Sequence, residues 1–571
     1  MERQPQEHRD PDAWWRHGVV YQVYPRSFQD SNGDGIGDLA GIRQRLPYLS
    51  ALGVDAVWLS PIYPSPMADF GYDVADYCDV DPIFGSLEDF DALLQDAHRL
   101  GLKVILDFVP NHTSDRHPWF VASRAARDNE FRDFYLWRDP APDGGPPNNW
   151  RSNFGGPAWS FDETTGQWYY HAFLPQQPDL NWRNPRVRQR MYDALRFWLA
   201  RGVDGFRVDV IWHLIKDERF RDNPPDPAWR PGMAQSKSVL QVYSADRPEL
   251  MEVVTEMRSV IAEFDDDMSS RILIGEIYLP IERLVAYYGS DEAGVLRGVQ
   301  LPFNFHLISA HWEAAALADL IRRYEAAIPQ AGWPNWVLGN HDQPRIASRV
   351  GAERAAVAAC LLLTLRGTPT LYYGEEIGMS DVAIPPEALR DPAELREPGK
   401  GQGRDPQRTP MQWDASTGAG FSQAKPWLPL APDYRERNVE GLRLDRRSIL
   451  SLYRALLALR RTEPALHAGA IDSVVATGDC LSFDRIHGPS RLRVQINFGL
   501  TAVELPTGQG DHPLLFSTAW FGEPASGNTD GGAMAKPSCD QAVPATGGAA
   551  ATGPLPPLVA RILRVEPPPA D

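Results

Sequence analysis

The stretch Gly205-Phe206-Arg207-Val208-Asp209-Val210 places an arginine and a carboxylate two residues apart at the end of a short apolar run. On a β-strand, residues two apart point to the same face of the sheet. Arg207 and Asp209 should therefore project together, and the cation should hold the carboxylate in its ionised form. The sequence thus predicts a fixed, ionised carboxylate at a strand end, as nucleophilic attack on a sugar requires.

Two further apolar segments also end in acids, in Gly275-Glu276 and in Asn340-His341-Asp342. Any one of these acids alone could be a helix N-cap or a solvated loop residue. Three acids at the ends of three strands, in this order, instead favour chemistry at one rim of a sheet.

A repeating unit of a helix, a glycine and an apolar strand leads to these acids. Asn184-Pro185 is typical of a helix start, with Asn as the cap and Pro in the first turn. Gly202 can end this helix in the left-handed conformation, and the strand Val203 to Val208 follows. Strands reached from helices by such short turns are parallel. The same order recurs at three other glycines: Gly53, Gly101 and Gly367.

Eight segments of the chain fit the strand of this unit. An α/β fold with eight such units is a closed (β/α)₈ TIM barrel, whose active site lies at the C-terminal ends of the strands. A doubly wound open sheet is the alternative, but no Gly-rich phosphate loop supports it. The predicted strands lie near Val20, Val57, Val104, Phe206, Leu273, Val299, Val337 and Leu371.

The spacing of the strands locates the insertions. The third and fourth strands are about a hundred residues apart, where a plain unit needs about thirty. We therefore expect residues 1–111 and 182–465 to form the barrel, and residues 112–181 to form an inserted, loop-rich subdomain B. A further insertion is expected at about 380–443, and a C-terminal antiparallel β domain at 466–571. Its Gly- and Ala-rich stretch, 525–553, is expected to be partly disordered.

Composition limits which kinds of partner the protein can bind and in which cell compartment it can occur. The formal net charge of −18 over 571 residues argues against nucleic acid as the main partner. Four cysteines without close pairing indicate neither a disulfide framework nor a zinc site. The N-terminus has no apolar segment of the kind found in signal peptides, and no run approaches the roughly 18 apolar residues of a membrane span. We expect a soluble, cytoplasmic protein without a membrane partner, and both a monomer and a dimer remain open.

Four short segments together resemble the α-amylase family of glycoside hydrolases, and particularly its α-glucosidase and oligo-1,6-glucosidase branch. The resemblance covers Val19 to Trp427, and Gly71-Tyr72-Asp73 and residues 403–413 also resemble this branch. It implies a TIM barrel and no organic cofactor. The four segments are Asp107-Phe108-Val109-Pro110-Asn111-His112, Gly205 to Asp209, Gly275-Glu276 and Asn340-His341-Asp342.

The resemblance implies a catalytic role for each of the three acids. Asp209 would be the nucleophile, Glu276 the general acid and base, and Asp342 the stabiliser of the transition state. A retaining glycosidase needs two carboxyl groups about 5 Å apart on either side of the sugar carbon. Glu276 must also stay protonated near neutral pH, so we expect its apolar flanks, Ile274 and Ile277, and the neighbouring acids to raise its pKa.

The same resemblance implies a set of substrate-binding residues around the acids. Asp73 and Arg404 would pair and hold the non-reducing terminal glucose, although a surface ion pair is the alternative. Phe154 and Phe173 would form pocket walls, although core packing is the alternative. Such a closed pocket implies exo-action. The full expected set is Asp73, His112, Phe154, Phe173, Arg207, Val210, His341 and Arg404.

The loop from Asp30 to Asp38 carries oxygen ligands at alternate positions around a central glycine, which suits a hard cation such as Ca²⁺. It is not an EF-hand, because Gly41 stands where a bidentate Glu belongs. Related α-glucosidases hold a structural Ca²⁺ or Mg²⁺ in a similar loop, and an Asx-turn loop without metal is the alternative. The expected ligands are Asp30, Asn32, Asp34, the Ile36 carbonyl and Asp38.

The function that the resemblance implies is a retaining, exo-acting α-glucosidase that acts on small α-glucosides. In this branch a valine after the nucleophile, here Val210, tends to accompany α-1,6 preference, but one side chain shifts such a preference by only about 1–3 kcal/mol. A transglucosylase would use the same residues. A non-catalytic, transporter-associated relative is the remaining alternative, but this chain keeps all three acids and has no membrane segment.

Overall fold

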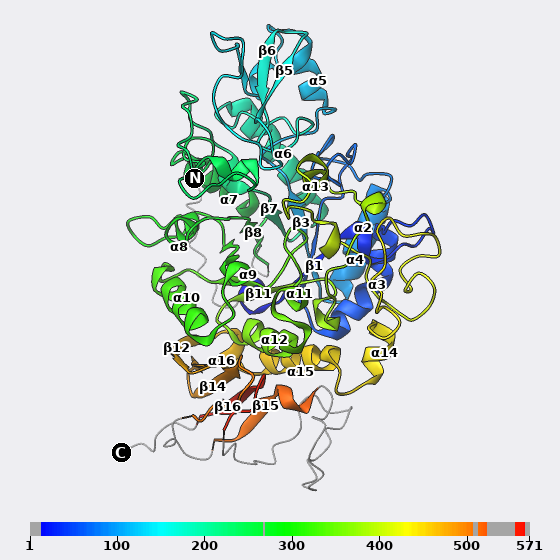
Figure 1. Cartoon of the computed structure of the whole chain (residues 1–571), viewed down its shortest axis with the longest axis vertical. Coiled ribbons are helices and arrows are strands. Elements are labelled where there is room, and N and C mark those ends of the chain that lie inside the picture. The colour runs from blue at the N-terminus through cyan, green and yellow to red at the C-terminus, as the bar shows by residue number, and fades with distance from the viewer. Residues whose placement is uncertain (1–12, 267–268, 506–511, 522–553, 566–571) are drawn as a thin grey trace.

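A computed structural model of the chain describes residues 13–266, 269–505, 512–521 and 554–565. The Gly- and Ala-rich stretch 525–553 lies outside the described residues. Three parts follow one another down the long axis of the molecule in Figure 1: a small subdomain, a barrel and a C-terminal β sheet.

The barrel is an eight-stranded parallel sheet with the strand order β10-β11-β1-β2-β3-β7-β8-β9. A parallel bridge between Asn304, next to β9, and Trp336 of β10 closes it. This confirms the predicted (β/α)₈ fold, and the strand expected near Val299 is the two-residue β9. The strands are β1 (Val20–Val23), β2 (Ala56–Leu59), β3 (Lys103–Phe108), β7 (Gly205–Val208), β8 (Ile272–Gly275), β9 (Leu301–Pro302), β10 (Asn335–Val337) and β11 (Thr368–Tyr372).

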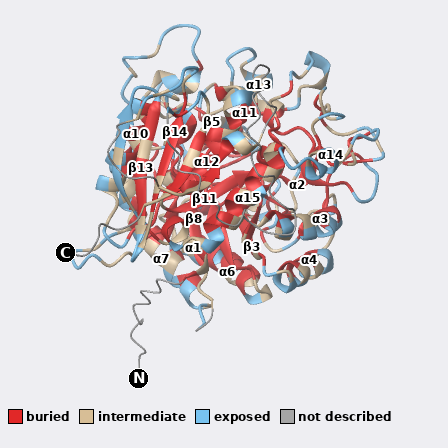
Figure 2. Ribbon diagram, turned by 90° about the horizontal axis from the view of Figure 1, so that it is seen from below, coloured by how far each residue is buried: buried red, intermediate tan, exposed pale blue. Residues whose placement is uncertain are grey.

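Helices surround the barrel. The longer ones are α3 (Leu39–Leu52), α4 (Leu87–Arg99), α6 (Pro185–Arg201), α7 (Leu250–Ala262), α10 (Ala314–Ala327), α12 (Ala355–Thr364) and α15 (Ile449–Thr462). Shorter ones are α1 (Trp14–His17), α2 (Pro25–Phe28), α8 (Ile281–Leu284), α9 (His306–Ser309), α11 (Ile346–Val350), α13 (Pro392–Arg396), α14 (Val439–Leu444) and α16 (Pro464–His467). Buried residues fill the barrel and the layer between strands and helices, as Figure 2 shows.

The unit that delivers Arg207 and Asp209 has the local structure expected from its sequence. The Asn184 side chain accepts a hydrogen bond from the Arg186 amide, Pro185 occupies the first turn of α6, and Gly202 ends the helix at φ 104°. Gly205 then starts β7 against β8, where a Cβ atom would lie only 2.5 Å from the Ile272 carbonyl oxygen. Only glycine fits this close approach of the two strands.

The segment between β3 and β7 folds as a small unit beside the C-terminal rim of the barrel. It contains α5 (Pro118–Ala125) and a three-stranded antiparallel sheet of β4 (Trp137–Arg138), β6 (Gln167–Tyr170) and β5 (Trp159–Asp162). Trp150, Trp159 and Tyr170 are buried in a separate apolar cluster. We call this segment, residues 112–181, subdomain B.

The C-terminal part is a five-stranded antiparallel sheet, as the short β-like runs of the sequence predict. Its order is β12-β13-β14-β16-β15. It packs against α10, α12 and α16 on the side of the barrel away from subdomain B (Figure 1). Its strands are β12 (Ala470–Thr477), β13 (Cys480–His487), β14 (Ser490–Asn497), β15 (Leu514–Ser517) and β16 (Ala560–Arg564). Within the described ranges, no helix is both long and apolar enough to cross a bilayer.

Candidate active site

Arg207 is the centre of the cluster that contains two of the expected catalytic acids. Its Nη1 atom lies 2.8 Å from Asp107 Oδ1 and 2.7 Å from Asp209 Oδ1, and its Nη2 atom lies 2.8 Å from Glu276 Oε2. Arg207 and Asp209 share one face of β7, as their spacing predicts, and Val208 pairs with Gly275 of β8, so Glu276 follows beside them. One guanidinium therefore brings the expected nucleophile and the expected general acid side by side.

Asp107 is a member of this cluster that the sequence analysis did not assign to the site. It lies in β3 opposite Arg207, and its other oxygen, Oδ2, accepts hydrogen bonds from Trp58 at 3.1 Å and Tyr72 at 3.0 Å. Asp107 is the first residue of one of the four family segments, and that position could have identified it as part of the site. Asp107 holds the arginine from the side away from Glu276.

Burial raises the pKa of Glu276, Arg207 lowers it, and the Asp342 carboxylate raises it further, so the net shift is upward as expected. Burial also raises the pKa of Asp209 well above its usual value, although Arg207 opposes this. From the sequence we expected Arg207 to keep Asp209 ionised. The structure shows that Asp107, Asp209 and Glu276 share this one cation. With one positive charge among three acids, the cluster retains a proton at a pH where isolated carboxyl groups have lost theirs.

Val210 connects the nucleophile strand to Glu276. Its backbone amide donates a 2.8 Å hydrogen bond to Glu276 Oε2, and its backbone has a φ of 34°. A left-handed conformation is unfavourable for a β-branched residue, and such strain persists only where the surrounding structure fixes it. The strained residue thus positions Glu276, the expected general acid, through its backbone.

Asp342 is held by a second group of cations. Arg408 Nη2 lies 2.8 Å and Arg404 Nη1 3.3 Å from its Oδ1 atom, while His341 Nε2 lies 3.2 Å from Oδ2. Burial alone would raise the pKa of Asp342, but Arg404 and Arg408 lower it below its usual value. The Asp342 side chain is 22% exposed, against 8% for Asp209 and 4% for Glu276. Asp342 is therefore ionised and is the most open of the three acids.

The two expected histidines both lie at this rim and are buried. Burial, together with Arg408, lowers the pKa of His341 well below its usual value, so the ring that lies beside Asp342 is neutral. Burial lowers the pKa of His112 to about 4, and its Nε2 atom lies 3.0 Å from the Tyr72 carbonyl. His341 also stacks on Tyr72, with ring centroids 5.2 Å apart. Tyr72 thus fixes both rings.

The predicted pairing of Asp73 with Arg404 is wrong. Arg404 Nη2 instead contacts Asp69 Oδ1 at 2.6 Å, and its Nε contacts Asp391 Oδ2 at 2.6 Å. Asp73 accepts hydrogen bonds from the amides of Ala68 and Asp69 and thereby shapes the turn that carries Asp69. Both acids lie in the segment Asp69 to Asp73, and sequence spacing alone does not distinguish the one that reaches the arginine.

Phe154 and Phe173 of subdomain B lie against the binding residues. The Arg404 guanidinium carbon is 4.7 Å from the centroid of the Phe154 ring, and Phe173 lies 5.2 Å from His112. The two phenyl rings contact each other edge to face at 5.5 Å. Subdomain B therefore supplies an aromatic wall beside Asp342 and Arg404.

The loop Asp30 to Asp38 lies away from this cluster and is organised by Asx turns. Asp30 accepts hydrogen bonds from the amides of Asn32, Gly33 and Gly35, and Asp38 accepts from the Gly41 amide at the start of α3. The side chains of Asn32 and Asp34 are exposed. No group of three or more His, Cys, Asp or Glu side chains is arranged around a metal position in the described part of the chain. The oxygen donors suit a hard cation in kind, but in this conformation they accept backbone hydrogen bonds.

Comparison with known proteins identifies the family that carries this arrangement. Residues 22–469 match the alpha amylase catalytic domain. The chain belongs to the α-amylase family. It is accordingly a glycoside hydrolase, and the α-amylase match includes every barrel strand except the first two residues of β1. The three acids expected to be catalytic lie within it.

Relatives within the α-amylase family are glucosidases by name. The chain is 45% identical over 459 residues to an alpha-glucosidase of Culex pipiens, covering 79% of this chain and 76% of that protein. It is 44% identical to a probable alpha-glucosidase of Rhizobium meliloti (strain 1021), covering 87% and 92%. An oligo-1,6-glucosidase of Parageobacillus thermoglucosidasius is 38% identical, with 85% and 90% covered.

Solved structures of related α-amylase family members include transfer enzymes. An alpha-glucosyl transfer enzyme superposes with a TM-score of 0.86 at 38% identity, covering 97% of this chain and 100% of that one. A trehalulose synthase from Pseudomonas mesoacidophila MX-45 superposes with a TM-score of 0.83 at 34% identity, covering 97% and 99%.

Proposed function

We propose that this member of the α-amylase family is a retaining, exo-acting α-glucosidase that releases glucose from the non-reducing end of short α-glucosides. The observation that carries the proposal is the double contact of Arg207 with Asp209 and Glu276. It presents two carboxyl groups together, as the double-displacement mechanism requires. The alpha-glucosidases among the relatives support the same substrate class.

In the first step an Asp209 carboxylate oxygen attacks the anomeric carbon of the terminal glucose. The bond between that carbon and the glycosidic oxygen breaks, and Glu276 donates its proton to the leaving oxygen. In the second step the Glu276 carboxylate takes a proton from water, whose oxygen attacks the same carbon and releases Asp209. Two inversions give net retention, and both side chains return to their starting protonation states.

The charges of the site suit this sequence of steps. The Asp342 carboxylate, kept ionised by Arg404 and Arg408, balances the positive charge that develops on the sugar in each transition state. It also raises the pKa of Glu276, after the larger effect of burial, and so favours the protonated general acid. In the working state we assign the proton to Glu276 and the negative charge to Asp209.

Exo-action is supported by the way the binding residues are packed. The Asp69–Arg404 ion pair is almost fully buried, and Phe154 covers the same guanidinium. An ion pair in this position can hydrogen-bond the hydroxyl groups of a terminal glucose, and its burial is what a site that ends at that glucose requires. His112, His341 and Phe173 complete the proposed site for this ring.

Preference for α-1,6 linkages is the finer part of the proposal. Val210 follows the nucleophile and is partly exposed, so its side chain can face the leaving group. The oligo-1,6-glucosidase relatives support this reading, whereas the alpha-glucosidase relatives have no linkage in their names. A panel of maltose, isomaltose, sucrose, trehalose and soluble starch separates these substrates by their kcat/KM values.

Transfer of glucose to an acceptor hydroxyl is the second candidate. The structural similarity to an alpha-glucosyl transfer enzyme favours it, with a TM-score of 0.86. The same covalent intermediate serves both reactions, and only the second acceptor differs. New glycosides formed at high acceptor concentration, in place of free glucose, would identify the transferase.

We also propose that the loop Asp30 to Asp38 binds a structural Ca²⁺ or Mg²⁺ through Asp30, Asn32, Asp34, the Ile36 carbonyl and Asp38. The all-oxygen donor set supports this. The ion would stabilise the loop and take no part in catalysis. A Tm that rises with added Ca²⁺ and falls with a chelator is expected; a Tm independent of both, in the wild type and in Asp34→Ala, would contradict it.

We further propose a cytoplasmic location. Cys78, Cys360 and Cys480 are free thiols, which suits a reducing compartment. Fractionation of cells that produce the full chain tests this, because recovery of the activity outside the cytoplasm would contradict it.

Replacement of the nucleophile tests the enzymatic proposal. Asp209→Asn should abolish hydrolysis of an aryl α-glucoside while the far-UV circular dichroism and the Tm stay close to wild type. The matched control is Asp193→Asn, on the exposed face of α6, which should leave turnover unchanged. Undiminished turnover by Asp209→Asn would remove the assignment.

A further inference from the structure

A second pocket lies between subdomain B and the segment that follows the nucleophile strand. It encloses about 220 Å³ and is lined by residues 133 and 135–138, 180–183, and 214–218 and 220. None of these residues contacts the catalytic carboxyl groups. The pocket is smaller than the roughly 300–1,000 Å³ of drug-sized sites, so it has room for one small ring.

One side of the pocket is apolar and aromatic. Leu136 and Phe220 belong to one apolar cluster, and the Arg138 guanidinium carbon lies 3.8 Å from the centroid of the Phe220 ring. Tyr135 and Trp182 are buried behind them. The Phe220 ring itself is covered by Arg138 and stacks on Trp150, with ring centroids 5.5 Å apart, so Leu136 supplies the apolar surface for the carbon face of a sugar ring.

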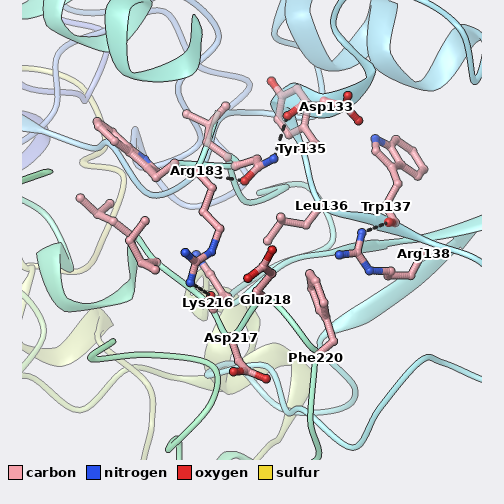
Figure 3. Close-up of a pocket in the computed structure, with 15 residues that line it drawn as sticks. Asp133, Tyr135, Leu136, Trp137, Arg138, Arg183, Lys216, Asp217, Glu218 and Phe220 are labelled. Atoms are coloured by element: carbon pink, nitrogen blue, oxygen red, sulfur yellow. Dashed lines mark hydrogen bonds between the residues drawn. The ribbon is translucent and has the colours of Figure 1, made fainter. Parts of the chain in front are cut away.

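The other side carries charged groups of both signs. In Figure 3 the Glu218 carboxylate lies between Arg183 and Phe220 and points into the pocket. Glu218 is exposed and forms no hydrogen bond or ion pair with the residues that the structure describes. Arg183 Nη2 donates to the Lys216 carbonyl at 2.9 Å and contacts Glu249 at 2.9 Å, so its guanidinium is fixed at the pocket edge.

We propose that this pocket binds a neutral pyranose such as glucose, as a second sugar site outside the catalytic centre. An anion would meet Glu218, and a cation would meet Arg138 and Arg183. A ring with many hydroxyl groups can donate to the Glu218 carboxylate and accept from the guanidinium groups while its carbon face contacts Leu136. This inference rests on the proposed function for its choice of sugar, because glucose is the product of that activity.

The pocket is connected to the catalytic rim through its own wall. Lys216 Nζ lies 2.8 Å from Asn111 Oδ1 and forms an ion pair with Asp179. Asn111 directly precedes His112 in the chain, and Asp179 forms a β-bridge with His112. His213 of the same segment lies 5.7 Å from Phe173. A sugar bound against residues 214–220 would restrain the segment that contacts Asn111, Asp179 and Phe173. Its binding should therefore change the KM for the α-glucoside substrate.

The experiment separates this site from the catalytic one by blocking the latter. A fluorinated glucosyl fluoride is used to form a slowly hydrolysed ester on Asp209, and the excess reagent is removed. Glucose, and maltotriose in a second arm, are then titrated calorimetrically into the trapped full-length enzyme. We expect saturable binding at one site per chain with a millimolar Kd, and equal or tighter binding of maltotriose if the site holds the end of a chain.

Glu218→Ala should weaken this binding at least about tenfold, because a charged hydrogen-bond acceptor is lost. The matched control is Glu163→Ala, an exposed glutamate elsewhere in subdomain B, which should bind as wild type. Both variants should hydrolyse a low concentration of aryl α-glucoside normally without added glucose.

Two results would overturn the second site. Absence of saturable binding to the trapped wild type up to about a hundred times the expected Kd would remove it. Binding that is equal in Glu218→Ala and Glu163→Ala would place the sugar at the acceptor side of the catalytic site. Failure of the reagent to add one glucosyl group to the chain would instead count against the proposed function, so the two failures are distinguishable.

Discussion

Arg404 Nη2 lies 2.6 Å from Asp69 Oδ1, and this buried ion pair stands directly beside Asp342. The pair joins the turn after β2 to the loop after β11, two segments far apart in the chain. It therefore fixes the distance between the end of the substrate site and the catalytic acid. We therefore expect its members, more than Asp73, to decide whether a terminal glucose is held.

Asp69→Asn should raise KM and lower kcat/KM for maltose and isomaltose by about a hundredfold, because the charge opposite a buried arginine is lost. Asp76→Asn, an exposed acid on the same loop, is the matched control and should be neutral. Steady-state kinetics of both variants measures the difference. An unchanged KM in Asp69→Asn would contradict the role given to the pair.

Asp391 should act as a positioning residue for Arg404. It is fully buried, contacts Arg404 Nε at 2.6 Å and caps α13 by accepting from the Ala393 amide. Asp391→Asn should raise KM about tenfold or more and change kcat less, since the arginine loses its orientation but the catalytic acids do not. Glu387→Gln, exposed in the same loop, is the control. Equal losses in kcat and kcat/KM, with KM unchanged, would speak against positioning.

Val210→Ala should shift preference from α-1,6 toward α-1,4 linkages. The removal of two methyl groups beside the leaving group is worth about 1–3 kcal/mol at most, so the ratio of kcat/KM for isomaltose and maltose should change by about ten- to a hundredfold. Val242→Ala, at an exposed valine, should leave the ratio unaltered. A ratio that is the same in all three proteins would remove Val210 from the linkage proposal.

Glu375 should make the fold less stable as the pH rises from acid to neutral. Burial raises its pKa from 4.5 to about 7, and the Tyr453 hydroxyl donates to it at 3.0 Å. Between these values the unfolded chain loses the proton first, so the native state is favoured below pH 4.5 and the stabilisation is lost as the pH passes 7.

Glu375→Gln should remove this dependence, which amounts to about 3 kcal/mol. Urea unfolding at pH 4.5, 6 and 7.5 measures the effect as the difference between variant and wild type, with Glu387→Gln as an exposed control. A difference that stays constant with pH would show that Glu375 is ionised in the native state.

The fold was predictable because its signals are local. Asn184, Pro185 and Gly202 cap α6 through contacts within a few residues, and the parallel strands follow from the short turns after each helix. The same-face relation of Arg207 and Asp209 follows from the period of a strand. Some helix ends differ from the expected positions. Helix α12 ends at Thr364, three residues before Gly367, because the chain becomes extended at Leu365 before it enters β11.

The partners of the binding residues were not predictable in the same way. Arg404 pairs with Asp69 and not with Asp73, because the turn between the two acids directs the Asp73 carboxylate to backbone amides. Asp107 and Arg408 reach the catalytic acids from strands and loops whose relative positions only the closed barrel defines. Such contacts depend on tertiary geometry, and no spacing along the chain encodes them.

The central claim is that Asp209 attacks the anomeric carbon while Glu276 serves as acid and base. Peptide mapping by mass spectrometry after labelling with a fluorinated glucosyl fluoride tests it most directly. We predict one fluoroglucosyl group per chain, on the peptide that contains Asp209, and labelling that persists in Glu276→Gln, because fluoride leaves without a proton, while that variant loses hydrolysis of maltose. A label on another residue, or an active enzyme that is never labelled, would contradict the claim.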